Sequence, residues 1–230
     1  MTDKDNSKKI SINITEDNTK TLCETDYLNL YDLQCIEGHH YINASRRKKD
    51  SLVALKSDDE FKALIPDAVT CFMIIKTPLE EPKLLLSYEF RYPVGQFLLS
   101  PPAGLIDEKD RSSEDPLIST AKREIFEETG IRLKDTDKIE LLCPCSFSSP
   151  GMSDESNALV AVRAELDDLS SLTQSGAEGT ECFDGFELVS KEEAEKLLSK
   201  GTDKFGNSYS VYTFCALMYF LLTTDPLSSH

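Results

Sequence analysis

Basic residues are scarce in this chain. Its 230 residues include 25 lysines and arginines against 41 aspartates and glutamates, which gives a formal net charge of −16. A surface that holds nucleic acid through its phosphates needs basic patches. The short basic run at residues 46–49 is best explained as the solvated end of a hairpin. We therefore expect no nucleic-acid partner.

Long apolar runs are also lacking. Residues 211–222 are apolar, but a helix that spans a bilayer needs about 20 residues. The first residues are charged and polar, without the apolar core of a secretory leader. The sequence therefore predicts a buried or dimer-facing helix at 211–223, no membrane partner and a cytoplasmic location.

The cysteines lack the spacings of a zinc site or a disulfide framework. There are seven, an odd number: Cys23, Cys35, Cys71, Cys143, Cys145, Cys182 and Cys215. Cys143 and Cys145 would share one face of a predicted strand, which indicates packing. His39 and His40 stand on a predicted turn and are not expected to bind metal. A reducing compartment suits this pattern.

The order of predicted elements indicates an α+β fold with one substantial core. Strands are predicted at residues 27–36, 41–46, 69–76, 83–90, 96–100, 138–146 and 157–165, and helices at 116–129, 190–199 and 211–223. Residues 1–22 are expected to form a polar arm that is either flexible or partly paired, and residues 23–60 a hairpin region that is a candidate for dimerisation. Residues 61–230 would form the main domain.

Residues 115–130 carry the start and stop signals of a helix. Asp115 can accept hydrogen bonds from free backbone N–H groups, and Pro116 loses none in the first helical position. Gly130 predicts the end of the helix. An apolar seam, within about 60° at about 100° per residue, is predicted to face the core and consists of Ile118, Ala121 and Ile125.

Three carboxylates gather on one side of this predicted helix. Glu124, Glu127 and Glu128 are spaced i, i+3 and i+4, so they share an arc of about 100°. A solvated acidic face is the ordinary explanation of such a cluster. However, like charges at these spacings repel, and the C-terminal half of a helix favours cations. The arrangement therefore favours bound Mg²⁺ or Mn²⁺, with Arg123 bracing Glu127 through an i, i+4 ion pair.

The segment 123–131 resembles the signature of Nudix hydrolases. It reads Arg-Glu-Ile-Phe-Glu-Glu-Thr-Gly-Ile. The first half of the signature differs, because ten residues separate Gly104 from Asp115 where the family usually has five before a glutamate. Asp115 stands at the spacing of that glutamate counted back from Arg123, but as a good helix cap it is not assigned to the metal. Residues 107–113 are expected to form a longer surface loop.

Flanking segments extend the resemblance to about three quarters of the chain. Residues 88–95 and 102–107 resemble the ADP-ribose pyrophosphatase branch, and residues 149–155 resemble its proline-bearing segment. Ser100 departs from the pattern, because relatives commonly carry a glutamate there. The resemblance implies a Nudix-type α/β/α sandwich with a mixed sheet and an N-terminal antiparallel hairpin or small sheet. It also implies a homodimer joined through that N-terminal sheet.

The resemblance implies roles for particular residues. Glu124 and Glu128 would bind metal, and Glu127 is close enough to share it. The backbone carbonyl of Ala103 would complete the set. Arg91 would contact the substrate's phosphates, since a guanidinium pairs bidentately with phosphate oxygens; the alternative is a salt bridge at the end of a strand. Metal would polarise the diphosphate and activate water, so no covalent nucleophile is required.

The residue that accepts the proton from this water is expected on a loop at residues 172–185. Glu181 is the candidate for this base, and Glu178 and Asp184 are its rivals. Glu155 could also serve, although its place in a Ser-Asp-Glu run suggests a structural or substrate contact.

These features predict a metal-dependent hydrolase that splits the diphosphate of a small nucleoside diphosphate derivative. ADP-ribose, giving AMP and ribose 5-phosphate, is the first expectation. An ADP-sugar or a dinucleotide is the alternative, because substrate choice lies in loops. A Nudix-fold regulator that binds a nucleotide without cleaving it is a different class. The complete Arg-Glu…Glu-Glu set speaks against that class, and Ser100 and the longer loop speak for it.

Overall fold

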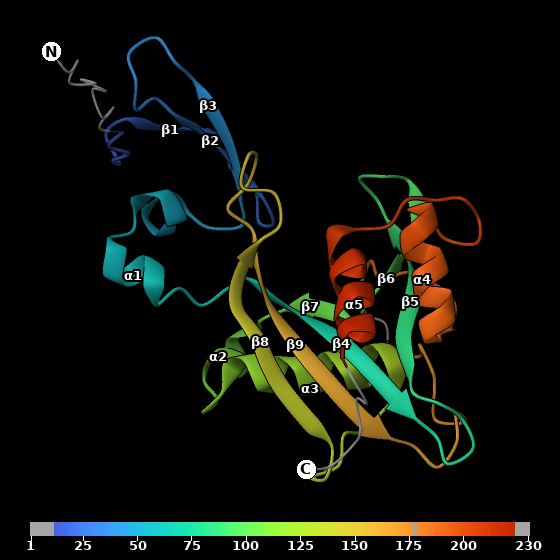
Figure 1. Cartoon of the computed structure of the whole chain (residues 1–230). Coiled ribbons are helices and arrows are strands. Elements are labelled where there is room, and N and C mark those ends of the chain that lie inside the picture. The colour runs from blue at the N-terminus through green and yellow to red at the C-terminus, as the bar shows by residue number, and fades with distance from the viewer. Residues whose placement is uncertain (1–11, 177–178, 224–230) are drawn as a thin grey trace, which may run out of the picture. The chain divides into compact units, whose positions relative to one another are not determined.

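A computed structural model describes residues 12–176 and 179–223 of the chain. The chain divides into two compact units (Figure 1). Among the described residues, unit 1 consists of 12–64 and 147–155, and unit 2 consists of 65–146, 156–176 and 179–223. No helix in the described ranges is long and apolar enough to cross a membrane.

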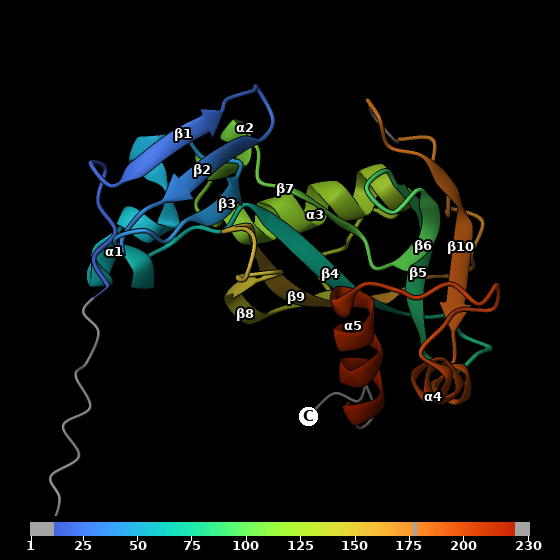
Figure 2. The same ribbon diagram turned by 90° about the horizontal axis from the view of Figure 1, so that it is seen from above.

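Unit 1 contains a small antiparallel sheet in the order β1-β2-β3 (Figure 2). Its strands are β1 (Thr19–Cys23), β2 (Asn29–Leu33) and β3 (Tyr41–Ser45), followed by the short helices η1 (Lys49–Ser51), η2 (Val53–Leu55) and α1 (Asp58–Lys62). The predicted hairpin of β2 and β3 is confirmed. No strand was predicted at β1, which except for Cys23 lies within the arm expected to be flexible or partly paired. A small core is formed by Tyr31, Leu33 and Leu52.

Unit 2 is built on a seven-stranded mixed sheet with the order β10-β5-β4-β9-β8, in which β6 pairs with β5 and β7 with β4. The strands are β4 (Ala68–Lys76), β5 (Lys83–Arg91), β6 (Gln96–Ser100), β7 (Ala103–Leu105), β8 (Lys138–Phe147), β9 (Ser156–Glu165) and β10 (Phe183–Val189). Strands β4 and β9 are parallel, and β5 is antiparallel to β4, β6 and β10. The five predicted main-sheet strands are confirmed, and β7 and β10 are additional.

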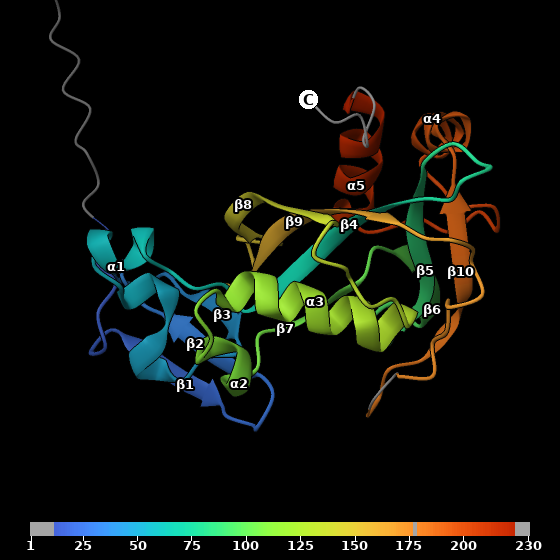
Figure 3. The ribbon, with the colours of Figure 1, turned by 90° about the horizontal axis from the view of Figure 1, so that it is seen from below.

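Helices cover both faces of this sheet (Figure 3). Helix α3 (Pro116–Thr129) packs on one face together with Leu85 of β5. Helices α4 (Lys191–Lys200) and α5 (Val211–Leu222) pack on the other, against Leu84 and Leu86. The described residues therefore form the predicted α+β sandwich.

The signals at the ends of α3 act as predicted. The Asp115 side chain accepts a hydrogen bond from Ile118 N at 3.2 Å, and Pro116 is the first helical residue. Gly130 ends the helix with a φ of 75°, in the left-handed region that favours glycine. Ala121 and Ile125 are fully buried, so the apolar seam faces the core as expected.

Candidate active site

The C-terminal half of α3 carries carboxylates into the protein. Glu124 and Glu128 are only 5% and 3% exposed, whereas the Glu127 side chain is 31% exposed. A solvated acidic face does not describe this cluster, because two of its three members are buried. Buried charges need a partner of opposite sign to offset their lost hydration.

Strand β7 lies directly against these carboxylates. Ala103 N donates a hydrogen bond to Glu128 Oε1 at 3.3 Å. A Cβ on Gly104 would lie 1.9 Å from the carboxyl carbon of Glu124. Glycine at residue 104 therefore leaves the space that the Glu124 carboxylate occupies.

Arg123 connects α3 to the segment before it. Its guanidinium donates to Asp110 Oδ2 at 2.8 and 3.0 Å, to Glu127 Oε2 at 2.8 Å and to the backbone oxygen of Leu105 at 2.8 Å. The same Nη1 lies 2.7 Å from Glu124 Oε1. Burial favours the neutral guanidinium, but these hydrogen bonds and carboxylate charges outweigh it and raise the pKa of Arg123.

The prediction of a surface loop at residues 107–113 was wrong. The segment forms a short helix, α2 (Glu108–Arg111), which places Asp110 at 6% exposure against Arg123. Burial opposes ionisation, but Arg123 and the Thr120 hydroxyl lower the pKa of Asp110. Five residues separate Gly104 from Asp110, the spacing of the resembled signature. Counting the signature spacing forward from Gly104 would have identified Asp110, whereas counting it back from Arg123 led to Asp115.

The crowding of carboxylates has an electrostatic signature. Burial raises the pKa of Glu124 to about 7; the charges of Glu127 and Glu181 add to this effect, and Arg123 opposes it. Burial, followed by the charge of Glu89, raises the pKa of Glu128 well above its ordinary value. Both shifts reflect negative charge that the described residues compensate only in part.

Glu89 is a member of this group that the sequence did not indicate. It lies on β5, two residues before Arg91, and the two side chains form an ion pair at 2.6 Å. Burial raises the pKa of Glu89, with Arg91 opposing the shift and Glu181 adding to it. The alternative expected for Arg91, a strand-end salt bridge, is therefore present. Strand alternation with Arg91 was the signal that could have identified Glu89.

The base candidates differ in their surroundings. Glu181 is exposed, and its charge acts on Glu89, Glu124 and Glu128, so it lies near the carboxylate group. Its rival Glu178 lies outside the described residues, and Asp184 is an exposed residue of β10. Glu155 belongs to unit 1.

The partners of Glu155 also lie in unit 1. Arg46 Nε donates to Glu155 Oε1 at 2.9 Å, and Ser148 Oγ lies 3.5 Å from Glu155 Oε2. These contacts match the structural role considered for this residue. Its contact with substrate stays a prediction.

The donor set fits a hard divalent cation, because it consists of carboxylate and backbone oxygens around a recess that a Cβ at residue 104 would fill. Within the described ranges, no three His, Cys, Asp or Glu side chains already surround one point. Glu124 faces Arg123, and Glu128 accepts from Ala103 N. A bound ion would therefore require these carboxylates to turn from their present partners.

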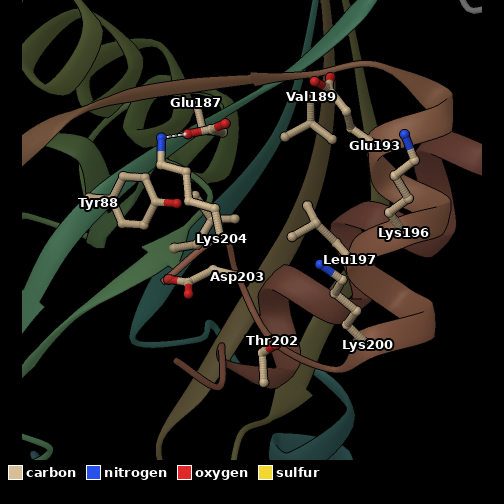
Figure 4. A pocket seen from close by; sticks show the side chains of 11 residues that line it. Tyr88, Glu187, Val189, Glu193, Lys196, Leu197, Lys200, Thr202, Asp203 and Lys204 are labelled. Atoms are coloured by element: carbon tan, nitrogen blue, oxygen red, sulfur yellow. Dashed lines mark hydrogen bonds and ion pairs between the residues drawn. The ribbon is translucent and has the colours of Figure 1, made fainter. Parts of the chain in front are cut away.

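A separate pocket of about 180 Å³ lies on the other face of β5 (Figure 4). Tyr88 lines it together with Glu187 and Lys204, which form an ion pair at 2.5 Å. Tyr88 and Glu89 are adjacent on β5 and point to opposite faces of the sheet. This pocket is therefore distinct from the carboxylate group beside α3.

Similarity to a known protein agrees with the signature. The chain is 33% identical over 90 residues to Nudix hydrolase 14, chloroplastic, of Arabidopsis thaliana. Over this segment the chain is similar to a Nudix hydrolase. The match covers 36% of this chain and only 28% of the Arabidopsis protein. No protein-family model matches this chain.

Solved structures also include a similar protein. A crystal structure of a C. elegans Ap4A hydrolase binary complex is 18% identical to this chain, with a TM-score of 0.42. The superposition covers 66% of this chain and 94% of that one.

Proposed function

We propose that this Nudix protein hydrolyses the diphosphate bond of a nucleoside diphosphate derivative with the help of Mg²⁺ or Mn²⁺. The observation that carries this proposal is the burial of Glu124 and Glu128 beside Gly104, at 5% and 3% exposure. Two buried carboxylates with raised pKa values form a site whose free energy a divalent cation would lower. The match to a Nudix hydrolase supports the same reaction class.

Each side chain would have a limited task in this reaction. Glu124 and Glu128, with Glu127 and the Ala103 carbonyl, would hold the ion. When bound, the ion would supply Lewis acidity and lower the pKa of the attacking water. Arg91 would exchange its partner Glu89 for substrate phosphate. Glu181, exposed and near the other carboxylates, would accept the proton.

ADP-ribose, cleaved to AMP and ribose 5-phosphate, is the substrate that we propose first. The segment 88–95, which contains Arg91, supports it, because this segment resembles the ADP-ribose pyrophosphatase branch. The test is a panel of ADP-ribose, ADP-sugars and dinucleotides with Mg²⁺ or Mn²⁺, with products separated by chromatography. We expect AMP from ADP-ribose only when metal is present. Tight binding of one compound without any product would instead favour a nucleotide-binding regulator.

Glu128→Gln tests the assignment of the site. Glutamine has the shape of a protonated glutamate, so the variant should remain folded because burial already favours the uncharged form. We expect turnover to fall by about 100-fold or more, since the charge that holds the metal is lost. Glu192→Gln, an exposed change on α4, is the control. Unchanged turnover in Glu128→Gln would contradict the site.

A further inference from the structure

Strand β5 presents polar groups toward α3. Leu85 packs in the core cluster that contains α3 residues, so the alternating residues Ser87, Glu89 and Arg91 face the same side. Tyr88 faces the opposite side, where Figure 4 shows it beside Glu187 and Lys204. Glu89 therefore reaches the α3 face from a different element than the carboxylates of the signature.

Glu89 and Glu128 reach that face from two different elements. The Glu89 side chain is 15% exposed. Ser87 on the same strand stands opposite Ser100, which comes three residues before the Ala103 that donates to Glu128. Arg91 pairs with Glu89 at 2.6 Å, whereas in the described part of the chain no lysine or arginine forms an ion pair with Glu128. Two carboxylates on this face therefore share one cationic partner.

A second observation lies on the same strand. Ser87 is 1% exposed, and its Oγ has no hydrogen-bond partner among the described residues. Ser87 stands opposite Ser100 of β6, which is also buried. Buried hydroxyl groups in proteins are normally hydrogen-bonded. A hydrated cation beside Glu89 would supply the missing partner, because Mg²⁺ usually keeps several of its waters.

We propose that Glu89 is a metal ligand in addition to those of the signature, and that it shares a divalent cation with Glu128. This inference rests on the proposed function. The rival role for Glu89 is to orient Arg91 and nothing else. The two roles differ in what they require, because orienting Arg91 needs only a hydrogen-bond acceptor, whereas holding a cation needs the negative charge.

Glu89→Gln separates the two roles. Glutamine keeps an acceptor for Arg91 but removes the charge. We expect calorimetric titration of the full chain with Mn²⁺ alone to show at least tenfold weaker binding in the variant, with unchanged melting of the metal-free protein. Glu187→Gln is the matched control on neighbouring β10, because its side chain lies on the other face and pairs with Lys204. Its affinity for Mn²⁺ should equal that of the unmodified chain.

The outcomes are distinguishable from a failure of the proposed function. Unchanged Mn²⁺ affinity in Glu89→Gln, with weakened binding in Glu128→Gln, would overturn the role of Glu89 and leave the hydrolase intact. If the unmodified chain bound no Mn²⁺ and cleaved nothing in the panel, both would fail. Glu89→Asp keeps the charge on a shorter side chain, so Mn²⁺ affinity between those of the unmodified chain and Glu89→Gln supports the proposal. Affinity as low as in Glu89→Gln contradicts it.

Discussion

At the scale of single residues, the site is short of positive charge. The Arg123 guanidinium forms ion pairs with Asp110, Glu124 and Glu127 at N–O distances of 2.7 to 3.0 Å. A second guanidinium, that of Arg91, forms an ion pair with Glu89. Buried carboxylates without full compensation cost free energy, so the proposed metal ion would also stabilise the folded protein.

Gly104→Ala tests whether the recess of the Glu124 carboxylate matters. The new Cβ would fall 1.9 Å from the carboxyl carbon, so this end of the side chain must move while the backbone can stay. We expect normal melting but turnover reduced by about 100-fold, because small displacements in an active site have effects of that order. Steady-state kinetics with Mg²⁺ measures the change.

The control for this variant is Gly151→Ala. Gly151 has open space around a Cβ and no left-handed φ, so alanine should alter neither melting nor turnover. Full activity in Gly104→Ala would show that the Glu124 carboxylate can move without consequence, and the proposed metal site would lose its geometric basis.

At the scale of elements, the two ends of α3 have different tasks. The first turn is held by the Asp115 cap, and the last turn carries the carboxylates. Asp115→Ala should therefore lower stability by about 1 kcal/mol, the usual worth of an N-cap, and leave turnover unchanged. For a chain of this size this corresponds to about 2–4 °C in melting temperature.

Asp115→Ser is the matched control, because serine is also a good N-cap and should restore the melting temperature. The pair also separates a cap from a ligand. If Asp115→Ala required much more Mg²⁺ for half-maximal activity, Asp115 would belong to the metal site. Its spacing before Arg123, which matches the glutamate of the resembled signature, is the reason to test this.

Much of the fold could be predicted because local patterns determine it. The limits of α3 follow from Asp115, Pro116 and Gly130, and the capping box at Ser190 places α4. Strand β10 and helix α2 escaped prediction because tertiary contacts define them: β10 pairs with β5, and α2 is anchored by Asp110 on Arg123. Glu89 was missed for the same reason, since its neighbours come from a distant helix.

At the scale of the whole molecule, the two units have separate cores. The signature carboxylates, Arg91 and Glu181 all belong to unit 2, whereas Glu155 belongs to unit 1. The role of the N-terminal sheet in joining two copies is not tested by this single chain and stays a prediction. The homodimer, the cytoplasmic location and the division at residues 22 and 60 stay predictions from the sequence.

The same carboxylates should couple stability of the whole molecule to pH and metal. Burial raises the folded-state pKa of Glu124 to about 7. Protonation of this carboxyl therefore stabilises the folded state, and its contribution to the free energy of unfolding is complete below pH 4.5, the ordinary pKa. It is lost as pH rises through about 7. Glu89 and Glu128 shift in the same direction. Metal binds the ionised form, so its stabilising effect should increase with pH.

We therefore expect Mg²⁺ at about 100 times its Kd, which stabilises a folded protein by about 2.7 kcal/mol, to raise the melting temperature by several degrees at pH 8 and hardly at pH 5.5. Carboxylates with a lowered pKa, such as Asp110, remain ionised at pH 5.5 and at pH 8, so they do not contribute to the difference between the two measurements. In Glu124→Gln, the melting temperature with Mg²⁺ should be closer to the melting temperature without Mg²⁺ at both pH values, because the variant lacks the carboxyl group that exchanges a proton for metal. An equal Mg²⁺ effect at both pH values would mean that these carboxylates do not hold the ion.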